Sequence, residues 1–227
     1  MIVLRQVVVG LYSEFMTTPI ASLRRSSPAT ASKAPRTRRR APREGAFGRD
    51  DWLAAARKAL VKGGIEQVKV ERLAKQVHVT RGSFYYHFRS RGELLNTLLD
   101  HWEATNTGPM LRAIDTAIAQ GPTGIHALVS MWIEEREFSP SYDSAVRDWA
   151  RKDAKVACVV RAVDDKRIAA LTLLMQVYGY QGDEAMVRAR VMYFHQVGYY
   201  ALGIHETLQE RLRLEPIYLK ALTGCAI

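Results

Sequence analysis

Polar, cationic and aromatic side chains are concentrated between residues 80 and 91 of the chain. Side chains of this kind on the exposed face of a helix suit contacts with the base edges and phosphate oxygens of DNA. Phe84 and Phe88 are four residues apart, so they would share the inward face and hold such a helix against its own core. The chemistry that this stretch predicts is recognition of a nucleic acid. The groups left for the DNA are Arg81, Ser83, Tyr85, Tyr86 and His87.

Three short helices are expected to position these groups. Apolar residues at helical spacing predict a first helix over residues 51–62, which Gly63 and Gly64 stop. A second helix is predicted from Lys69 to Val77. Thr80 would then be the N-cap of a third helix, from Arg81 to about Phe88. Two short helices joined by a tight turn make a helix-turn-helix unit.

The rest of the chain also has helical periodicity. Ser90 and Glu93 have the capping-box spacing, which predicts a fourth helix from residue 91 to 106 that Gly108 and Pro109 interrupt. Further helices are predicted over residues 110–119, 124–138, 142–153, 157–179, 183–204 and 207–222. No segment has the alternation of a strand, so the predicted fold is all-α, with a helix-turn-helix domain followed by a C-terminal helical domain.

Residues 63–95 carry the stretches LAKQV, VTRGSFYYHFRSR and ELL. In this order and spacing they strongly resemble the DNA-binding module of the TetR (tetracycline-repressor) family, and the resemblance covers about residues 47–100. It implies that Tyr85 and His87 touch phosphates and that Arg81, Gly82 and Tyr86 lie near base edges. The sequence departs from the family at His78, where a glycine is usual. If that position needs a positive φ, histidine adopts it at some cost.

The predicted DNA contacts are not limited to the third helix. Lys69 and Arg91, at the starts of the second and fourth helices, are expected to clamp phosphates. Two alternatives stay open: Tyr86 could be a core residue, and His87 could simply satisfy a neighbouring carbonyl group. The predicted DNA-binding residues are Lys69, Thr80, Arg81, Gly82, Ser83, Tyr85, Tyr86, His87 and Arg91, together with Arg38, Arg39 and Arg40.

Positive charge is concentrated at the start of the chain, whose net charge is +10. Residues 1–46 hold nine Lys and Arg against two Glu, and residues 47–100 hold ten basic against six acidic side chains. Residues 17–45 contain few large apolar side chains, so residues 1–46 are predicted to be a disordered basic arm. Such an arm could follow a DNA groove or be only a solvated tail.

The C-terminal domain, residues 96–227, is predicted to bind an effector and to dimerise. Large apolar and sulfur-bearing residues could line a pocket for a small apolar or aromatic molecule, although at helical spacing such residues are more often plain core. An empty, vestigial pocket is the alternative. The pocket candidates are Trp102, Met110, Met131, Trp132, Tyr142, Trp149 and Tyr193.

A dimer interface is implied by the family resemblance, in which the last two long helices of the domain form a four-helix bundle with their twofold mates. Here these helices would be residues 161–179 and 183–204. The interface candidates are Leu171, Leu174, Met175, Val191, Phe194, Val197 and Tyr199. Two copies would then meet a palindromic operator.

Catalytic motifs are not found in the sequence. It has no paired carboxylates, metal-ligand spacing, phosphate-binding glycine loop or nucleophile elbow, so we expect neither an enzyme nor a metal or other cofactor. The two cysteines, Cys158 and Cys225, suggest a reduced, cytoplasmic protein. Arg5 interrupts the apolar opening, which argues against a signal sequence. Both Met1 and Met16 stay open as the first residue.

Two hypotheses follow from these patterns. The first is a sequence-specific regulator, a repressor by resemblance, that binds a palindromic operator as a homodimer and is released by a small-molecule effector. The alternative is an architectural DNA-binding protein, in which the basic arm dominates and unrelated DNA sequences bind equally well.

Overall fold

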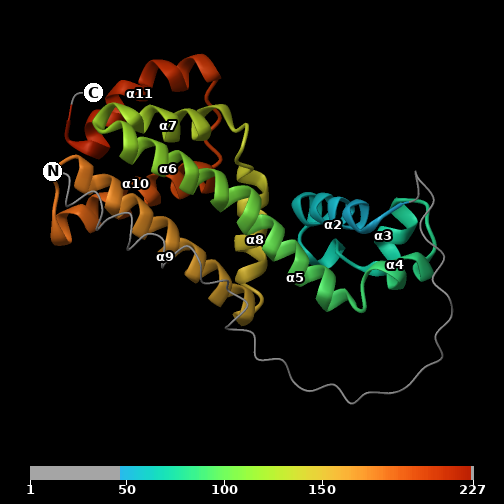
Figure 1. Ribbon diagram of the computed structural model, residues 1–227. Helices are drawn as coiled ribbons and strands as arrows, with labels where there is room; N and C mark the ends of the chain where they lie inside the picture. The colour runs from blue at the N-terminus through green and yellow to red at the C-terminus, as the bar shows by residue number, and fades with distance from the viewer. Residues whose placement is uncertain (1–46, 226–227) are drawn as a thin grey trace. The chain divides into compact units, whose positions relative to one another are not determined.

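The computed structural model describes residues 47–225, and all regular elements in this range are helices (Figure 1). The predicted all-α fold is confirmed. The N-terminal part contains α2 (Arg49–Gly63), α3 (Val70–Gln76), α4 (Arg81–His87) and α5 (Arg91–Trp102). The C-terminal part contains α6 (Gly108–Gln120), α7 (Ile125–Glu134), α8 (Pro140–Ala150), α9 (Ala154–Val177), α10 (Gly182–Ala201) and α11 (Leu208–Thr223).

Hydroxyl side chains begin the third and fourth helices at the predicted residues. The backbone N–H of Ser83 donates to Thr80 Oγ1 at 3.3 Å, and that of Glu93 donates to Ser90 Oγ at 3.2 Å. Both N-caps are therefore confirmed. The capping box at Ser90 is only half formed, because the Glu93 carboxylate accepts the backbone N–H of Arg89 at 2.8 Å instead.

The turn between α3 and α4 depends on His78, which has a φ of 56°. This left-handed conformation is the one expected at the position where the family usually has glycine. The backbone N–H of Val79 donates to the carbonyl oxygen of Ala74 at 3.0 Å and closes the turn. The tight helix-turn-helix geometry is therefore kept with a histidine, at the steric cost that a Cβ adds to this conformation.

The junction of α5 and α6 differs from the prediction. Gly108 and Pro109 do not interrupt the helix; α5 continues through a π-helical turn, Glu103–Thr107, directly into α6. The N–H of Gly108 bonds to the carbonyl oxygen of Glu103, and Pro109 lies in the first turn of α6, where the missing N–H of proline is tolerated. A single helical path therefore joins the two parts of the chain.

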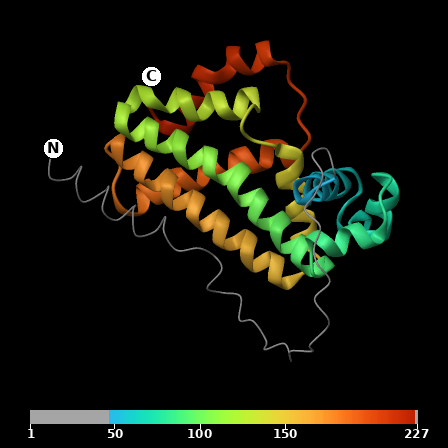
Figure 2. The same ribbon diagram turned by 45° about the vertical axis from the view of Figure 1, so that its right-hand side comes forward.

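The C-terminal helices form a layered bundle. Helices α9 and α10 lie side by side, α6 packs on α9, α7 on α6, and α11 on α7 (Figures 1 and 2). Helix α8 packs against α9 and α10 and also against α2 and α5. It is therefore the element of the C-terminal part that contacts the helix-turn-helix region most directly.

Helix α7 ends earlier than predicted, at Glu134 rather than at residue 138. Glu135 has a φ of 53°, which stops the helix. Among residues 47–225, none of the helices combines the length and the apolar character that crossing a membrane requires.

Candidate nucleic-acid interface

Helix α4 is anchored by aromatic residues in its own small core. Phe84 and Phe88 are 0% and 1% exposed, with ring centroids 5.4 Å apart in a stacked arrangement. The ring of Trp52, which is also fully buried, meets Phe84 edge-on at 5.2 Å. The prediction that Phe84 and Phe88 face inward is confirmed. The side of α4 that points to solvent is thereby fixed.

Two tyrosines form the exposed part of this helix. Tyr85 is 51% exposed and Tyr86 is 36% exposed. The alternative that Tyr86 is wholly a core residue is wrong, because more than a third of it reaches solvent. Arg81 and Gly82, one helical turn earlier, are exposed as well. Three side chains, those of Arg81, Tyr85 and Tyr86, thus present aromatic, hydroxyl and cationic groups on one face, with Gly82 beside them.

The Arg81 side chain of α4 forms an ion pair with a glutamate of α3. Its Nη1 lies 3.2 Å from Glu71 Oε1 on α3. A hydrogen bond with Tyr85 and the charge of Glu71 raise the pKa of Arg81 above its ordinary value. Both members of the ion pair are 60% exposed, so the pair adds little stability. Its effect is to orient a guanidinium that stays accessible beside Tyr85.

Gly82 is not required by the packing of the protein. A Cβ at this position would meet only Thr80 Oγ1, at 3.7 Å, which is an ordinary contact. Gly92 occupies the corresponding second position of α5, where a Cβ would meet only Ser90 Oγ, at 3.5 Å. Both glycines follow an arginine and a capping hydroxyl, so they form a matched pair in two different surroundings.

Lys69 and Arg91 are brought to the same place. Lys69 is the exposed N-cap residue of α3. Arg91 Nε donates to the carbonyl oxygen of Val68 at 2.6 Å, and its Nη2 donates to that of Ile65 at 3.4 Å. The guanidinium therefore stands beside the start of α3, next to Lys69, although part of its donor capacity is used within the protein.

His87 and Arg49 tie the end of α4 to the rest of the domain. His87 is half-buried, and its Nε2 lies 3.2 Å from the carbonyl oxygen of Phe47. This contact agrees with the alternative that His87 satisfies a carbonyl group of the protein. Arg49 donates to the carbonyl oxygen of His87 at 2.7 Å and to Glu93 at 3.0 Å, and it stacks over Phe88. No pattern in the sequence predicts this role of Arg49, since its partners lie about forty residues away.

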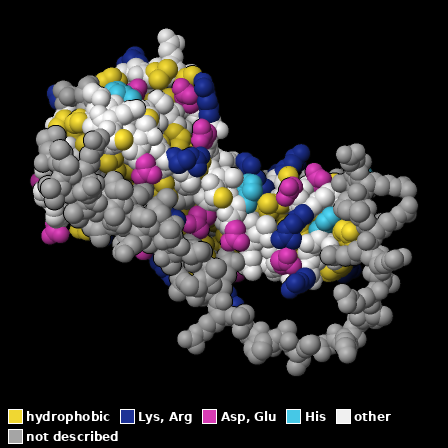
Figure 3. Space-filling model, viewed as in Figure 1, with side chains coloured by type: hydrophobic (Ala, Val, Ile, Leu, Met, Phe, Trp, Pro, Cys, Tyr) yellow, Lys and Arg dark blue, Asp and Glu magenta, His cyan; other side chains and the backbone are white. Residues whose placement is uncertain are grey.

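The remaining predicted DNA-binding residues are Ser83, Thr80 and three arginines of the N-terminal arm. Ser83 is half-buried and donates its N–H to the exposed residue Thr80. Arg38, Arg39 and Arg40 lie outside the described residues. On the face drawn in Figure 3, Lys and Arg side chains alternate with Asp and Glu over the helix-turn-helix region. The charge of this face is therefore mixed rather than uniformly positive.

The C-terminal bundle contains a cavity of about 240 Å³ between α6, α7, α8, α9 and α10. Three predicted pocket residues line it: Met110, Trp132 and Tyr193. The other four, Trp102, Met131, Tyr142 and Trp149, are not among its lining residues. Tyr142 is fully buried and donates its hydroxyl to the carbonyl oxygen of Leu98.

Charged residues line one end of the cavity, which the sequence did not predict. Arg147 bonds Asp143 at 2.8 Å and Asp164 at 2.7 Å, and Arg167 bonds Asp143 at 3.0 Å. The Tyr193 hydroxyl donates to Asp164 at 2.6 Å. Burial would by itself raise the pKa of Asp143, but the charges of Arg167 and Arg147 outweigh it and lower that pKa. The only sequence signal was the i,i+4 spacing of Asp143 and Arg147.

The predicted dimer residues separate into buried, half-buried and exposed positions. Leu171, Leu174 and Met175 are completely buried within the chain, so their assignment to an exposed interface is wrong. Tyr199 is 9% exposed and bonds Glu206 at 3.0 Å. Val191 and Phe194 on α10 are 49% and 58% exposed. Val197 is half-buried and lines the cavity.

Residues 47–225 thus combine a helix-turn-helix domain with a helical bundle, the architecture of a helix-turn-helix regulator. Residues 53–98 match the family described as "Bacterial regulatory proteins, tetR family". The HTH-type transcriptional regulator TtgR and the probable regulator ArpR, both of Pseudomonas putida, are each 34% identical over 68 residues. Those residues are 30% of this chain and 32% of each relative, so the match spans about a third of their length. The helix-turn-helix part of the chain is therefore similar to that of TetR-family regulators.

Two solved structures share the fold over most of the chain. Escherichia coli NemR in its reduced form has a TM-score of 0.53 at 19% identity, covering 78% of this chain and 94% of that one. A transcriptional regulator from Rhodococcus sp. Rha1 has a TM-score of 0.51 at 20% identity, covering 77% and 91%. At this level of identity, the likeness extends to the fold of the C-terminal bundle and not to its ligand.

Proposed function

We propose that this chain is a DNA-binding transcription regulator that inserts α4 into the major groove. The observation that carries the proposal is the division of α4 into a buried side and an exposed side: Phe84 and Phe88 are buried against the core, while Tyr85 and Tyr86 are exposed. Arg81 joins them with a planar donor group suited to base edges. Lys69 and Arg91 flank this face and supply phosphate contacts.

The chain acts in this proposal as a homodimer on a palindromic operator. Val187, Val191 and Phe194 lie on one face of α10 and are each about half exposed, which suits a twofold helix contact. Two copies of α4 would then reach half-sites roughly 34 Å apart or a multiple of it. The basic arm that includes Arg38, Arg39 and Arg40 would add contacts along the DNA.

A small molecule in the cavity of the C-terminal bundle would regulate binding, with repression as the default state. Helix α8 lines the cavity through Asp143 and also touches α5, where Trp102 Nε1 donates to Asp143 Oδ1 at 3.0 Å. A shift of α8 would therefore move α5 and change the spacing of the two recognition helices.

The matched glycines test the DNA-binding face. Gly82→Ala and Gly92→Ala should both leave the fold intact, since each adds a methyl group that makes only an ordinary contact with the capping hydroxyl and replaces glycine by a better helix former. If the DNA backbone approaches α4 closely, only Gly82→Ala should weaken operator binding, by about tenfold or more. Fluorescence anisotropy with DNA from upstream of the gene measures this, and equal affinities for the two variants would refute the proposed face.

Deletion of residues 1–46 separates the regulator from the architectural alternative. Binding should survive the deletion and resist scrambled competitor DNA, because base contacts from α4 specify the site. Binding that is lost with the arm and is indifferent to sequence would instead assign the function to the basic arm.

A further inference from the structure

We infer that the groove between α2 and α8 binds a small amphiphilic anion, whose carboxylate pairs with Arg57 and whose alkyl chain lies on apolar side chains of α2. The groove has a volume of about 540 Å³. It is lined by the outward face of α2, by His101 of α5 and by two serines at the start of α8. None of its lining residues is shared with the cavity of the C-terminal bundle, so the inference adds a second ligand site and goes beyond the proposed function.

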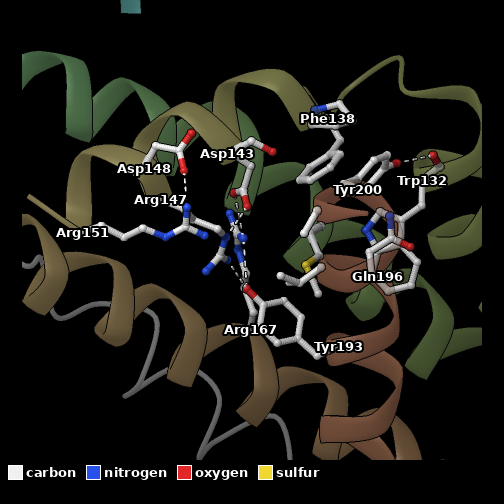
Figure 4. A pocket seen from close by; sticks show the side chains of 15 residues that line it. Trp132, Phe138, Asp143, Arg147, Asp148, Arg151, Arg167, Tyr193, Gln196 and Tyr200 are labelled. Atoms are coloured by element: carbon white, nitrogen blue, oxygen red, sulfur yellow. Dashed lines mark hydrogen bonds and ion pairs between the residues drawn. The ribbon is translucent and has the colours of Figure 1, made fainter. Parts of the chain in front are cut away.

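Arg57 is half-buried but has no acidic partner among residues 47–225. The other arginines of this range that are not exposed each pair with a carboxylate: Arg147 and Arg167 with Asp143 (Figure 4), Arg188 with Glu184, and Arg211 with Glu135. A charge that is partly removed from water without a counter-charge is costly. An anion bound at Arg57 would therefore supply the partner that the described part of the chain lacks.

The geometry around Arg57 suits a carboxylate. Its guanidinium carbon lies 5.1 Å from the ring centroid of Tyr142, a fully buried residue of α8, so the aromatic ring helps to orient it. A planar guanidinium can donate two parallel hydrogen bonds to one carboxylate. Ser139 and Ser141 also line the groove, and their hydroxyl oxygens are 3.3 Å apart. Their mutual hydrogen bond uses one hydroxyl hydrogen, which leaves the other for a ligand oxygen.

Positive charge exceeds negative charge in the lining of the groove. Arg57, Lys58 and Lys62 stand against one acidic residue, Asp50. The charge of Arg57 already acts on a neighbour, because together with burial, the larger cause, it lowers the pKa of His101. The two lysines are exposed, so water solvates them, and only Arg57 gains much from a counter-charge. A ligand with a single negative charge meets this need.

Apolar side chains of α2 form the rest of this side of the groove. Leu53, Ala54 and Val61 line it together with Arg57, because their spacing places them on one face of the helix. Ala54 is exposed and Val61 is 37% exposed. The helix rises about 10 Å from Ala54 to Val61, enough for a short alkyl chain. An inorganic anion would leave this apolar surface in water, whereas an alkyl chain would cover it.

Calorimetric titration of the DNA-free protein tests the class of ligand with three probes. Octanoate carries both the carboxylate and the chain, 1-octanol has the chain without the charge, and acetate has the charge without the chain. We expect octanoate to bind about tenfold or more tightly than either of the others, because it alone gains both the charge-assisted hydrogen bonds and the apolar contact. Equal binding of 1-octanol or of acetate, or no binding of octanoate, overturns the inference.

Arg57→Gln tests the site itself, and Arg161→Gln is its matched control. Arg161 is an exposed arginine of α9 outside the lining of the groove, so both variants change the net charge equally. Arg57→Gln should reduce the preference for octanoate over 1-octanol severalfold, and Arg161→Gln should leave it unchanged. An equal preference in the two variants would place the ligand elsewhere and overturn the inference.

The pKa of His101 gives a second reading of the same site. Because the charge of Arg57 contributes to lowering this pKa, an anion bound at Arg57 should raise it. Proton NMR of the imidazole ring in wild-type protein, with and without octanoate, measures the shift. A pKa that octanoate leaves unchanged contradicts binding at Arg57. Neither measurement uses DNA, so both are independent of whether α4 recognises an operator.

Discussion

The strongest test of the buried ion pairs is the substitution Asp143→Asn. Asp143 is 7% exposed and accepts hydrogen bonds from Arg147 Nε at 2.8 Å, Arg167 Nη1 at 3.0 Å and Trp102 Nε1 at 3.0 Å. An amide keeps one acceptor oxygen but removes the negative charge, which leaves Arg167 buried without its counter-charge. Removing one partner of a buried ion pair costs about 3–5 kcal/mol. Because one acceptor remains, we expect a loss of about 3 kcal/mol.

A matched control distinguishes burial from charge. Asp148, on the same helix, pairs with Arg151 at 2.6 Å, but these side chains are 63% and 76% exposed. Asp148→Asn should therefore cost under about 0.5 kcal/mol. Urea unfolding at pH 7, followed by circular dichroism, measures both values. For a chain of this size, the Asp143→Asn loss corresponds to a fall in Tm of about 6–12 °C.

The pH dependence of this loss has a defined sign. The pKa of Asp143 is lower in the folded protein than in the unfolded chain, so the unfolded chain binds the proton more readily. Its contribution is complete above a pH of about 4 and is lost as the pH falls through the folded pKa. The gap between wild type and Asp143→Asn should be constant from pH 7 to 5 and should narrow below about pH 4. Equal destabilisation by Asp143→Asn and Asp148→Asn would refute the reasoning.

Three further outcomes are expected. Lys69→Ala should weaken binding to all DNA sequences and lower the salt slope by ~1, whereas Tyr86→Ala should relax base preference at an unchanged slope; anisotropy at several salt concentrations separates the two. Burial and the charge of Arg57 lower the pKa of His101 in the folded protein. As the pH falls, His101 is therefore protonated at a higher pH in the unfolded chain than in the folded protein, and stability should fall below about pH 6.5. His101→Gln should reduce that fall in urea midpoints, and an identical pH profile would contradict it. Phe194→Glu should give monomers in light scattering, whereas a persisting dimer would place the interface elsewhere.

The helix-turn-helix was predictable because its signals are local. Caps at Thr80 and Ser90, the turn at His78 and the inward pair of Phe84 and Phe88 depend on residues within a few positions of one another. Such caps and helical periodicity can be predicted from neighbouring residues alone, without the packing of the rest of the chain.

The cavity and the dimer face were harder to predict for two different reasons. Leu171, Leu174 and Met175 have the same apolar spacing that an interface would have, and the spacing cannot say whether a second helix of the same chain or a partner covers them. Arg167 has its partners 24 to 60 residues away in the sequence. A charged residue in a long helix is usually solvated, so its burial follows only from the tertiary packing.

The charged cluster of Arg147, Arg167, Asp143 and Asp164 lies beside the π-helical turn that joins α5 to α6. Buried ion pairs seldom stabilise a protein more than apolar residues of the same volume, and an unpaired donor such as Arg167 Nη2 adds a further cost. An apolar residue at position 167 could fill the space, but it would form no directional hydrogen bond with the π-helical turn and so would not favour one position of that turn. Hydrogen bonds from one guanidinium to Thr107, Asp143 and Tyr193 are satisfied in only one register of three elements. The hydrogen bonds of the cluster therefore favour one arrangement of α8, α10 and the π-helical turn, at some cost in stability.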